Sequence, residues 1–190
     1  MLTLNFPSFP VIYTERLILR EHALTDAGVL FAMRNDERVM AYINRERPNE
    51  LADAEKLIAL MADSYLLSKN LVWVIALRDN PGQMIGSIGY YRTDFANYRA
   101  EVGYMILPTF WRQGLVAEAL KKVITFGFEE IKLHSISAHI NPANGASRQM
   151  LLRHGFVKEA LFRENYYFNG EFLDSEIYSL LAREVKWTSR

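Results

Sequence analysis

The 190-residue sequence contains no cysteine. Disulfide bonds, thiolate metal ligands and a cysteine nucleophile are therefore excluded. An excess of charge is also missing, because 22 Lys and Arg residues balance 22 Asp and Glu residues. This balance argues against broad electrostatic binding to nucleic acid or to an anionic membrane.

Long apolar runs are absent as well. No stretch approaches the roughly 20 apolar residues that cross a bilayer, and the first residues lack the basic segment and apolar core of a signal peptide. We therefore expect a cytoplasmic protein. Half of the residues are hydrophobic and 23% are charged, which is typical of a globular domain.

The expected organisation is an arm over residues 1–13, one domain over residues 14–183 and a tail over residues 184–190. The arm contains two prolines and the aromatic residues Phe6, Phe9 and Tyr13. We expect these rings to pack on the domain or on a partner subunit, which leaves a homodimer open.

The first half of the chain shows helical spacing and then alternation. The pattern predicts a strand over residues 16–20, a helix within 25–36 and a helix within 49–70. Three β-rich segments follow, over residues 71–77, 84–92 and 99–107. Residues 78–83 are the first turn between them, with Pro81-Gly82 as its signal, so we expect an antiparallel meander.

The second half begins with a long amphipathic helix after Gly114 and a strand over residues 134–140. A strand, a long helix and another strand indicate a crossover, so the sheet should be mixed. A short helix ending at Gly155 and a hairpin with an Asn169-Gly170 turn complete the chain. The predicted fold class is α/β (α+β), with a mostly antiparallel sheet of six to seven strands and about four helices.

Gly114 lies where a strand ends and the long helix begins. The first amides of a helix have no intrahelical partners and favour a phosphate there, and a residue without Cβ lets a ligand approach the main chain. The alternative is a plain helix-entry turn. A P-loop is excluded by the missing Gly-Lys-Ser/Thr ending, and a dinucleotide fingerprint is excluded because only one glycine is present.

Three segments in order, "AEVGYMILPTFWRQGLVAEAL", "SISAHINPANGASRQMLLRHGF" and "RENYYFNGEFLDSEIYSLL", resemble the GNAT superfamily of N-acyltransferases. The resemblance is to the RimJ/RimL type and covers about residues 14–183. It implies acetyl-CoA as cosubstrate, no metal, and transfer of the acetyl group to a primary amine such as the N-terminal amine of a protein.

The resemblance also implies the residues that bind CoA. The pyrophosphate loop of the family corresponds to Trp111–Val116, where Gly114 matches and Trp111 replaces Gln or Arg. Val116 departs from the small residue of the family, so its side chain either crowds the phosphates or turns into the core. The implied CoA-binding residues are Arg112, Gln113, Gly114, Leu115, Val116, Ala117 and Asn144, together with the backbone of Met105, Ile106 and Leu107.

The implied catalytic residues are Glu101, Ser147 and Tyr166. Glu101 would take the proton of the ammonium group, Ser147 would lie near the thioester sulfur, and Tyr166 would protonate the departing thiolate, with Tyr167 as the alternative. Each has a plainer interpretation: a surface charge on a strand, a helix cap and a packing residue. We interpret all four histidines as structural.

Because a cysteinyl acyl-enzyme is impossible, direct transfer in a ternary complex is favoured. Two other functions stay open at this point. One is acetylation of a small amine, such as a polyamine or an aminoglycoside, and the other is a non-catalytic module that binds acyl-CoA.

Overall fold

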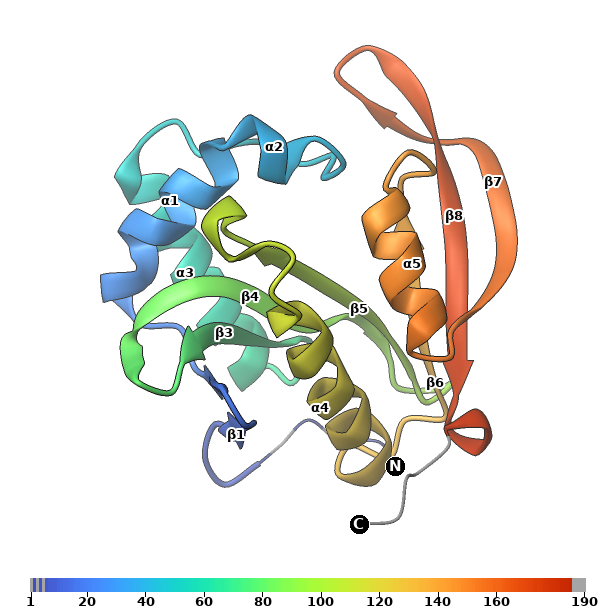
Figure 1. Cartoon of the computed structure of the whole chain (residues 1–190), viewed down its shortest axis with the longest axis horizontal. Coiled ribbons are helices and arrows are strands. Elements are labelled where there is room, and N and C mark those ends of the chain that lie inside the picture. Colours follow the sequence, from blue (N-terminus) through green and yellow to red (C-terminus); the bar gives the residue numbers. More distant parts are fainter. Residues whose placement is uncertain (1, 3, 5, 186–190) are drawn as a thin grey trace.

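The computed structural model describes residues 2, 4 and 6–185 of the chain. Its centre is one sheet of eight strands in the order β1-β2-β3-β4-β5-β6-β8-β7 (Figure 1). The strands are β1 (Ile12–Tyr13), β2 (Leu17–Arg20), β3 (Leu71–Leu77), β4 (Asn80–Asp94), β5 (Arg99–Ile106), β6 (Ser135–Ile140), β7 (Val157–Phe168) and β8 (Glu171–Leu181). Neighbouring strands are antiparallel except β5 and β6, which are parallel.

Helices cover both faces of the sheet (Figure 1). One face carries α1 (Ala27–Asn35), α2 (Glu37–Met40) and α3 (Leu51–Leu66), and the other carries α4 (Leu115–Glu129) and α5 (Gly145–Arg153). Short 3-10 turns are η1 (Leu24–Asp26), η2 (Pro108–Phe110) and η3 (Ala182–Glu184). The predicted fold class is confirmed. The described residues add a strand and a helix, because β1 and α2 have only two and four residues and show no readable period.

The turn predicted over residues 78–83 is present but shorter than predicted, and its predicted signal, Pro81-Gly82, is not part of it. The turn falls on Arg78–Asp79, and Pro81 and Gly82 lie inside β4. Register shifts on both sides of Ala76 make the β3–β4 ladder irregular at this end. A proline, which has no N–H to donate, is tolerated in such an irregular end of a hairpin.

The N-terminal arm packs on the domain itself. Leu2 and Leu4 are buried in the main hydrophobic core. The ring of Phe9 lies 5.0 Å from the ring of Tyr65, and the indole N–H of Trp73 donates to the carbonyl of Pro10 at 2.6 Å. These contacts extend the core beneath β3.

Helix α4 crosses Tyr90 of β4 at Gly127. Tyr90 is fully buried, and its hydroxyl donates to the carbonyl of Val123 at 2.7 Å. A Cβ on residue 127 would lie 2.8 Å from the ring carbon Cζ of Tyr90. The helix and the sheet therefore approach this closely only because position 127 has no side chain.

We predict that Gly127→Ala destabilises the fold by about 1–3 kcal/mol, because the buried ring of Tyr90 has no free space into which it can move. Gly28→Ala in α1 is the matched control, since a Cβ there meets nothing within 4 Å. The control should be neutral or up to about 1 kcal/mol more stable. Urea unfolding of both variants measures the difference, and equal stabilities would contradict this account of the crossing.

Candidate active site

Strands β5 and β6 are paired over three residues only. Arg99–Glu101 lie opposite Ser135–Ser137, and beyond this point the two strands separate (Figure 1). Strand β5 continues to Ile106 and β6 to Ile140, so both have backbone groups without a strand partner. Such an edge can receive an extended ligand in the way it would receive another strand.

The three residues predicted to bind a ligand through their backbone lie on this part of the chain. The amide of Leu107 donates to the carbonyl of Ile85 in β4 at 2.9 Å, so this amide is already engaged. The backbone N–H and C=O groups of successive strand residues point to opposite sides. Those of Met105 therefore also point toward β4, and those of Ile106 point toward the open edge. The carbonyl of Ile106 accepts a hydrogen bond from Nε1 of Trp111 at 3.0 Å.

The loop before α4 contains two left-handed residues, Arg112 with φ 60° and Gly114 with φ 75°. The N–H of Glu118 donates to the carbonyl of Gly114 at 3.0 Å, which is the first bond of the α-helical ladder. The amides of Leu115–Ala117 precede it and have no intrahelical acceptor. Free amides at a helix N-terminus beside left-handed turns form a concave site that suits an anion.

The start of α4 is tied to the segment before β2. The Nε of Arg16 lies 2.7 Å from Oε2 of Glu118, and Nη1 of Arg16 donates to the carbonyl of Gln113 at 3.0 Å. The hydroxyl of Thr14 donates to the other oxygen of Glu118. Burial raises the pKa of Glu118, but these hydrogen bonds outweigh it and leave the pKa below its ordinary value. The first turn of α4 is thus held by a charged carboxylate.

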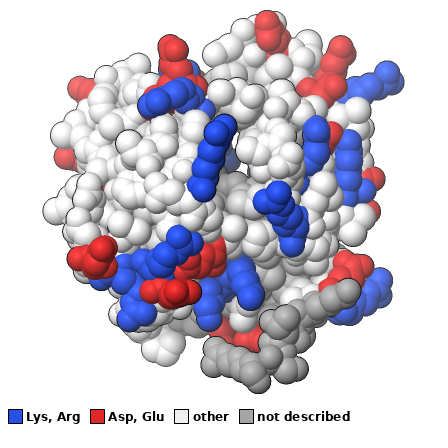
Figure 2. Space-filling view, viewed as in Figure 1, with Lys and Arg blue, Asp and Glu red and all other residues white. Residues whose placement is uncertain are grey.

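Val116 and Ala117 connect the start of α4 to the interior of the protein. The side chain of Val116 is half-buried and packs against the hydrophobic core, so it turns inward. The carbonyl of Ala117 lies 3.1 Å from Nε2 of His154, which joins α4 to α5. On the face that shows both helices, Lys and Arg side chains line the middle, between the two halves of the molecule (Figure 2).

A pair of hydroxyls bridges β5 and α5. The Oη of Tyr104 and the Oγ of Ser147 are 2.6 Å apart, and Ser147 is buried. Burial raises the pKa of Tyr104 to about 12, so its phenol stays protonated at neutral pH. The side chain of Asn144 caps α5 by accepting from the amide of Ser147 at 3.0 Å. Sequence reasoning missed Tyr104, because the position looks like an ordinary aromatic residue of a strand.

Helix α5 is held against the last two strands by a buried carboxylate. Glu176 of β8 is 4% exposed and accepts hydrogen bonds from Arg148, Lys158 and Tyr178. Burial raises the pKa of Glu176, but these donors outweigh it and hold the pKa at about 2. Because Arg148 follows Ser147 directly, this network fixes the position of the Tyr104–Ser147 pair.

Glu101 is the last residue of β5 that is paired with β6. Its Oε2 lies 2.7 Å from Nη1 of Arg92 and 3.7 Å from Nδ1 of His139. His139 of β6 lies just beyond the last pair, so the two side chains meet where the strands separate. The structure therefore places one histidine beside a candidate catalytic carboxylate, although all four were interpreted as structural.

Tyr91 and Glu101 lie on the sheet face that α1–α3 cover, and the charges of two arginines also act on Tyr91. Tyr91 lies directly across from Glu101 in the β4–β5 ladder. Burial raises the pKa of the Tyr91 phenol, Arg34 and Arg45 lower it, and Glu101 raises it further. The charges of all three groups therefore act on one phenol.

Tyr166 lies elsewhere. Its hydroxyl donates to the carbonyl of Asn44, between α2 and α3, at 2.7 Å. Tyr167 is 61% exposed, and its ring lies 5.0 Å from that of Phe172. The hydroxyl beside Ser147 thus belongs to Tyr104, while Tyr166 joins the last hairpin to the α2–α3 loop.

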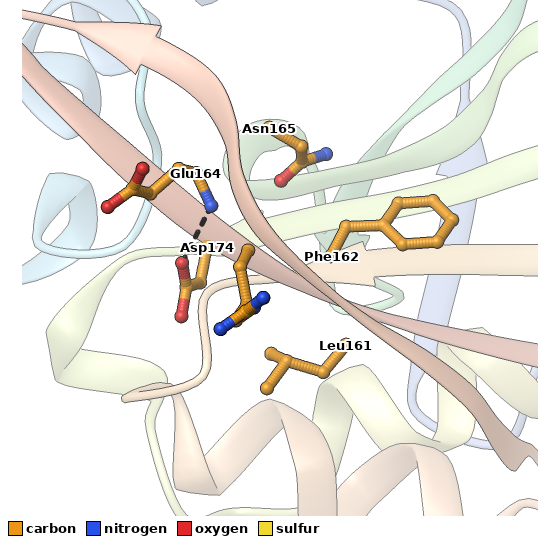
Figure 3. A pocket seen from close by; sticks show the side chains of 6 residues that line it. Leu161, Phe162, Glu164, Asn165 and Asp174 are labelled. Carbon is orange, nitrogen blue, oxygen red and sulfur yellow. Dashed lines mark hydrogen bonds between the residues drawn. The ribbon is translucent and has the colours of Figure 1, made fainter.

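The hairpin itself contains a hollow (Figure 3). It forms at a bulge in β7, where the register shifts between Phe162 and Tyr166 and the amide of Glu164 donates to Asp174 at 2.8 Å. The Asn169-Gly170 turn of this hairpin has φ values of 49° and 88°, which confirms the predicted type of turn. The hollow contains none of the predicted site residues; it is lined by Leu161, Phe162, Arg163, Glu164, Asn165 and Asp174.

Comparison with known proteins gives consistent matches. Residues 16–157 match the model of the acetyltransferase (GNAT) domain. The N-acetyltransferase YoaA of Bacillus subtilis is 35% identical over 173 residues, which are 91% of this chain and 97% of that protein. The ribosomal-protein-serine acetyltransferase of Escherichia coli is 27% identical over 97 residues, 51% of this chain and 54% of that protein.

Solved structures share the fold. RimJ of Mycobacterium smegmatis, solved with CoA-disulfide, has a TM-score of 0.83 at 20% identity and covers 93% of this chain and 88% of its own. Spermidine N-acetyltransferase of Vibrio cholerae, solved with CoA and spermine, has a TM-score of 0.77 at 20% identity and covers 88% and 96%. Within the described residues, no helix has the length and apolar character needed to cross a membrane. The family match over most of the domain, together with these relatives, shows that the chain is an acetyl-CoA-dependent N-acetyltransferase of the GNAT family.

Proposed function

We propose that the protein transfers the acetyl group of acetyl-CoA directly to the N-terminal amine of a protein. The observation that carries this proposal is the placement of two proton-handling groups on opposite faces of β5. Glu101 lies on the face of α1–α3, and the Tyr104–Ser147 pair lies on the face of α5. An amine and a thioester that arrive from the two faces would meet where β5 and β6 separate.

The residues present fit CoA. The pyrophosphate would bind the free amides of Leu115–Ala117 in the concave loop that Gly114 allows, with Arg112 as a further cation. The pantetheine arm would follow the open edge of β5 at Ile106. Asn144 uses its side-chain oxygen as a helix cap, which leaves its amide nitrogen for a ligand. Acetyl-CoA supplies a thioester whose carbonyl carbon forms a bond to nitrogen as its bond to sulfur breaks, and CoA leaves.

The side chains of this chain would move the protons. Glu101 takes one proton from the ammonium group, so that the nitrogen has a free electron pair. His139, beside Glu101, orients the carboxylate or passes that proton on. As the nitrogen forms its bond to carbon it loses a second proton, and one proton ends on the departing sulfur. Ser147 donates a hydrogen bond to that sulfur and is in turn supported by the protonated Tyr104, so this pair acts as the acid. Holding both reactants together supplies much of the rate.

The acceptor is the finer part of the proposal. A protein N-terminus is supported by the likeness to the ribosomal-protein-serine enzyme, and the spermidine enzyme shares the fold at low identity. Mass spectrometry of products formed from acetyl-CoA with a panel of peptides and polyamines tests the proposal. Acetylation of small amines alone would contradict it. The homodimer and the cytoplasmic location stay predictions.

We predict that Gly114→Val weakens binding of CoA more than tenfold, because the added side chain blocks approach to the amides. Gly170→Val is the matched control: it also places valine at a left-handed position, which costs about 1–2 kcal/mol, but far from the loop. Calorimetric titration with CoA and urea unfolding give both quantities. Equal affinities of the two variants for CoA would show that Gly114 is only a turn residue.

We predict that Glu101→Gln lowers kcat at neutral pH about a hundredfold or more, the usual contribution of a general base. The rate should recover partly at higher pH, where the amine loses its proton unaided. The measurement is a pH–rate profile with CoA affinity as the control, which should stay unchanged. Near-normal turnover across the profile would leave positioning, rather than proton removal, as the source of catalysis.

We predict that Ser147→Ala and Tyr104→Phe lower kcat without rescue by raised pH, since both remove hydrogen-bond donation toward the sulfur. Tyr166→Phe tests the residue that the family resemblance favours. Because its hydroxyl is bonded to Asn44, this variant should change kcat less than either of the other two. A larger loss for Tyr166→Phe would return the acid role to Tyr166.

A further inference from the structure

Basic side chains predominate on the sheet face covered by α1–α3, where Glu101 would meet the acceptor amine. Arg34 lies in the last turn of α1 and is 8% exposed. Among the described residues its guanidinium has no carboxylate partner, and its buried Nε has no hydrogen-bond acceptor. Arginine is almost never buried unless it is paired, because removing its charge from water costs free energy. The partner of Arg34 is therefore missing from the described part of the protein.

The neighbours of Arg34 do not neutralise it. Burial lowers its pKa, Tyr91 raises it, and the like charge of Arg45 lowers it further. Arg45 itself is exposed and forms no ion pair with the described residues. Its loop is held in place, because Tyr166 binds the carbonyl of the preceding residue, Asn44. Arg45 is thus a second cation whose charge acts on Arg34.

A hollow of about 440 Å³ continues this region, and no acidic residue lines it. Its lining consists of Arg45, Lys69, Asn70, Tyr91, Arg92, Thr93 and Phe95. The hydroxyl of Thr93 is buried and has no hydrogen-bond partner in the described structure. Glu101, which lies across from the lining residue Tyr91 in the β4–β5 ladder, is already bonded to Arg92 at 2.7 Å. The hollow therefore offers donors and positive charge without a matching acceptor.

We infer that the acceptor amine carries a carboxylate close to it, and that Arg34, Arg45 and Lys69 bind this carboxylate while Glu101 faces the amine. The inference rests on the proposed acetyl transfer and names the class of acceptor. Guanidinium groups bind carboxylates through paired, charge-assisted hydrogen bonds. A polycation such as spermidine would meet like charges here, and no acidic residue in the lining of the hollow.

The test compares peptide acceptors that differ in charge at two positions, together with two small amines. Hexapeptides begin with serine and have glutamate, glutamine or lysine at the second and third positions, and free glutamate and spermidine complete the panel. With the wild-type protein and acetyl-CoA, kcat/KM should be about tenfold or more higher for the glutamate peptide than for the glutamine peptide, and lowest for the lysine peptide and spermidine. Free glutamate as the best acceptor would identify a small amino acid, rather than a peptide, as the source of the carboxylate.

Arg45→Gln should remove most of this preference by raising KM for the glutamate peptide, with kcat nearly unchanged, because the contact is remote from the reacting atoms. Arg34→Gln should have the same effect if this variant folds. If it does not fold, Arg45→Gln still tests the inference, because Arg45 is exposed. Arg163→Gln, in the hollow of the last hairpin, is the matched control and should keep the preference. Equal rates for the three peptides, or spermidine as the best acceptor, would overturn the inference and leave acetyl transfer intact. Acetylation of no amine at all would overturn the proposed function and the inference with it.

Discussion

The separation of β5 and β6 after three paired residues is the constraint on which the rest of the structure depends. A sheet that opens in this way leaves backbone groups unpaired and loses the ladder that would hold its halves together. Other links must replace the ladder. Helix α4 packs under both halves, His154 joins α5 to α4, the Tyr104–Ser147 pair joins β5 to α5, and Tyr166 joins the last hairpin to the α2–α3 loop.

The start of α4 is the second consequence of that opening. A crossover helix must begin beside the end of β5, so its free amides point toward the same open region. The left-handed geometry that aims them is unfavourable for Arg112, by roughly 1–2 kcal/mol. The tie from Arg16 and Thr14 to Glu118 opposes that strain, since it fixes the first turn from the far side of the loop. The loop is thus held in shape before a ligand arrives.

Local pattern predicted the elements, because alternation and helical spacing are properties of neighbouring residues. The crossover, the mixed sheet and the Asn169-Gly170 turn followed from such patterns. The β3–β4 hairpin followed as well, but the exact place of its turn did not, since the irregular ladder beside Ala76 depends on pairing with another strand. Gly114 was proposed as a ligand-binding residue because a glycine at the start of a helix lets a ligand approach the free amides. Val116 needed the structure, since only packing decides which way a half-buried side chain turns.

The candidate site was predicted less completely than the fold, and the reason is long-range contact. Tyr104 and Ser147 are 43 residues apart, and Tyr166 and Asn44 are 122 apart. No spacing in the sequence brings such pairs together. The resemblance implied Ser147 and Tyr166 as catalytic residues, whereas the hydroxyl beside Ser147 belongs to Tyr104. His139 lies in no recognisable motif. It comes close to Glu101 only because β5 and β6 are paired in parallel up to Glu101 and Ser137.

Charge shows the same limit of sequence reasoning in its clearest form. The chain as a whole is neutral, with 22 basic and 22 acidic residues, and this balance argues against a large field around the molecule. It says nothing about where charges are paired. Glu176 and Glu118 gather cations around buried or half-buried carboxylates, while Arg34 and Arg45 lie together with no carboxylate of their own among the described residues. The proposed selection of an acceptor rests on this local imbalance, because a ligand responds to the groups within a few ångströms of it and not to the net charge.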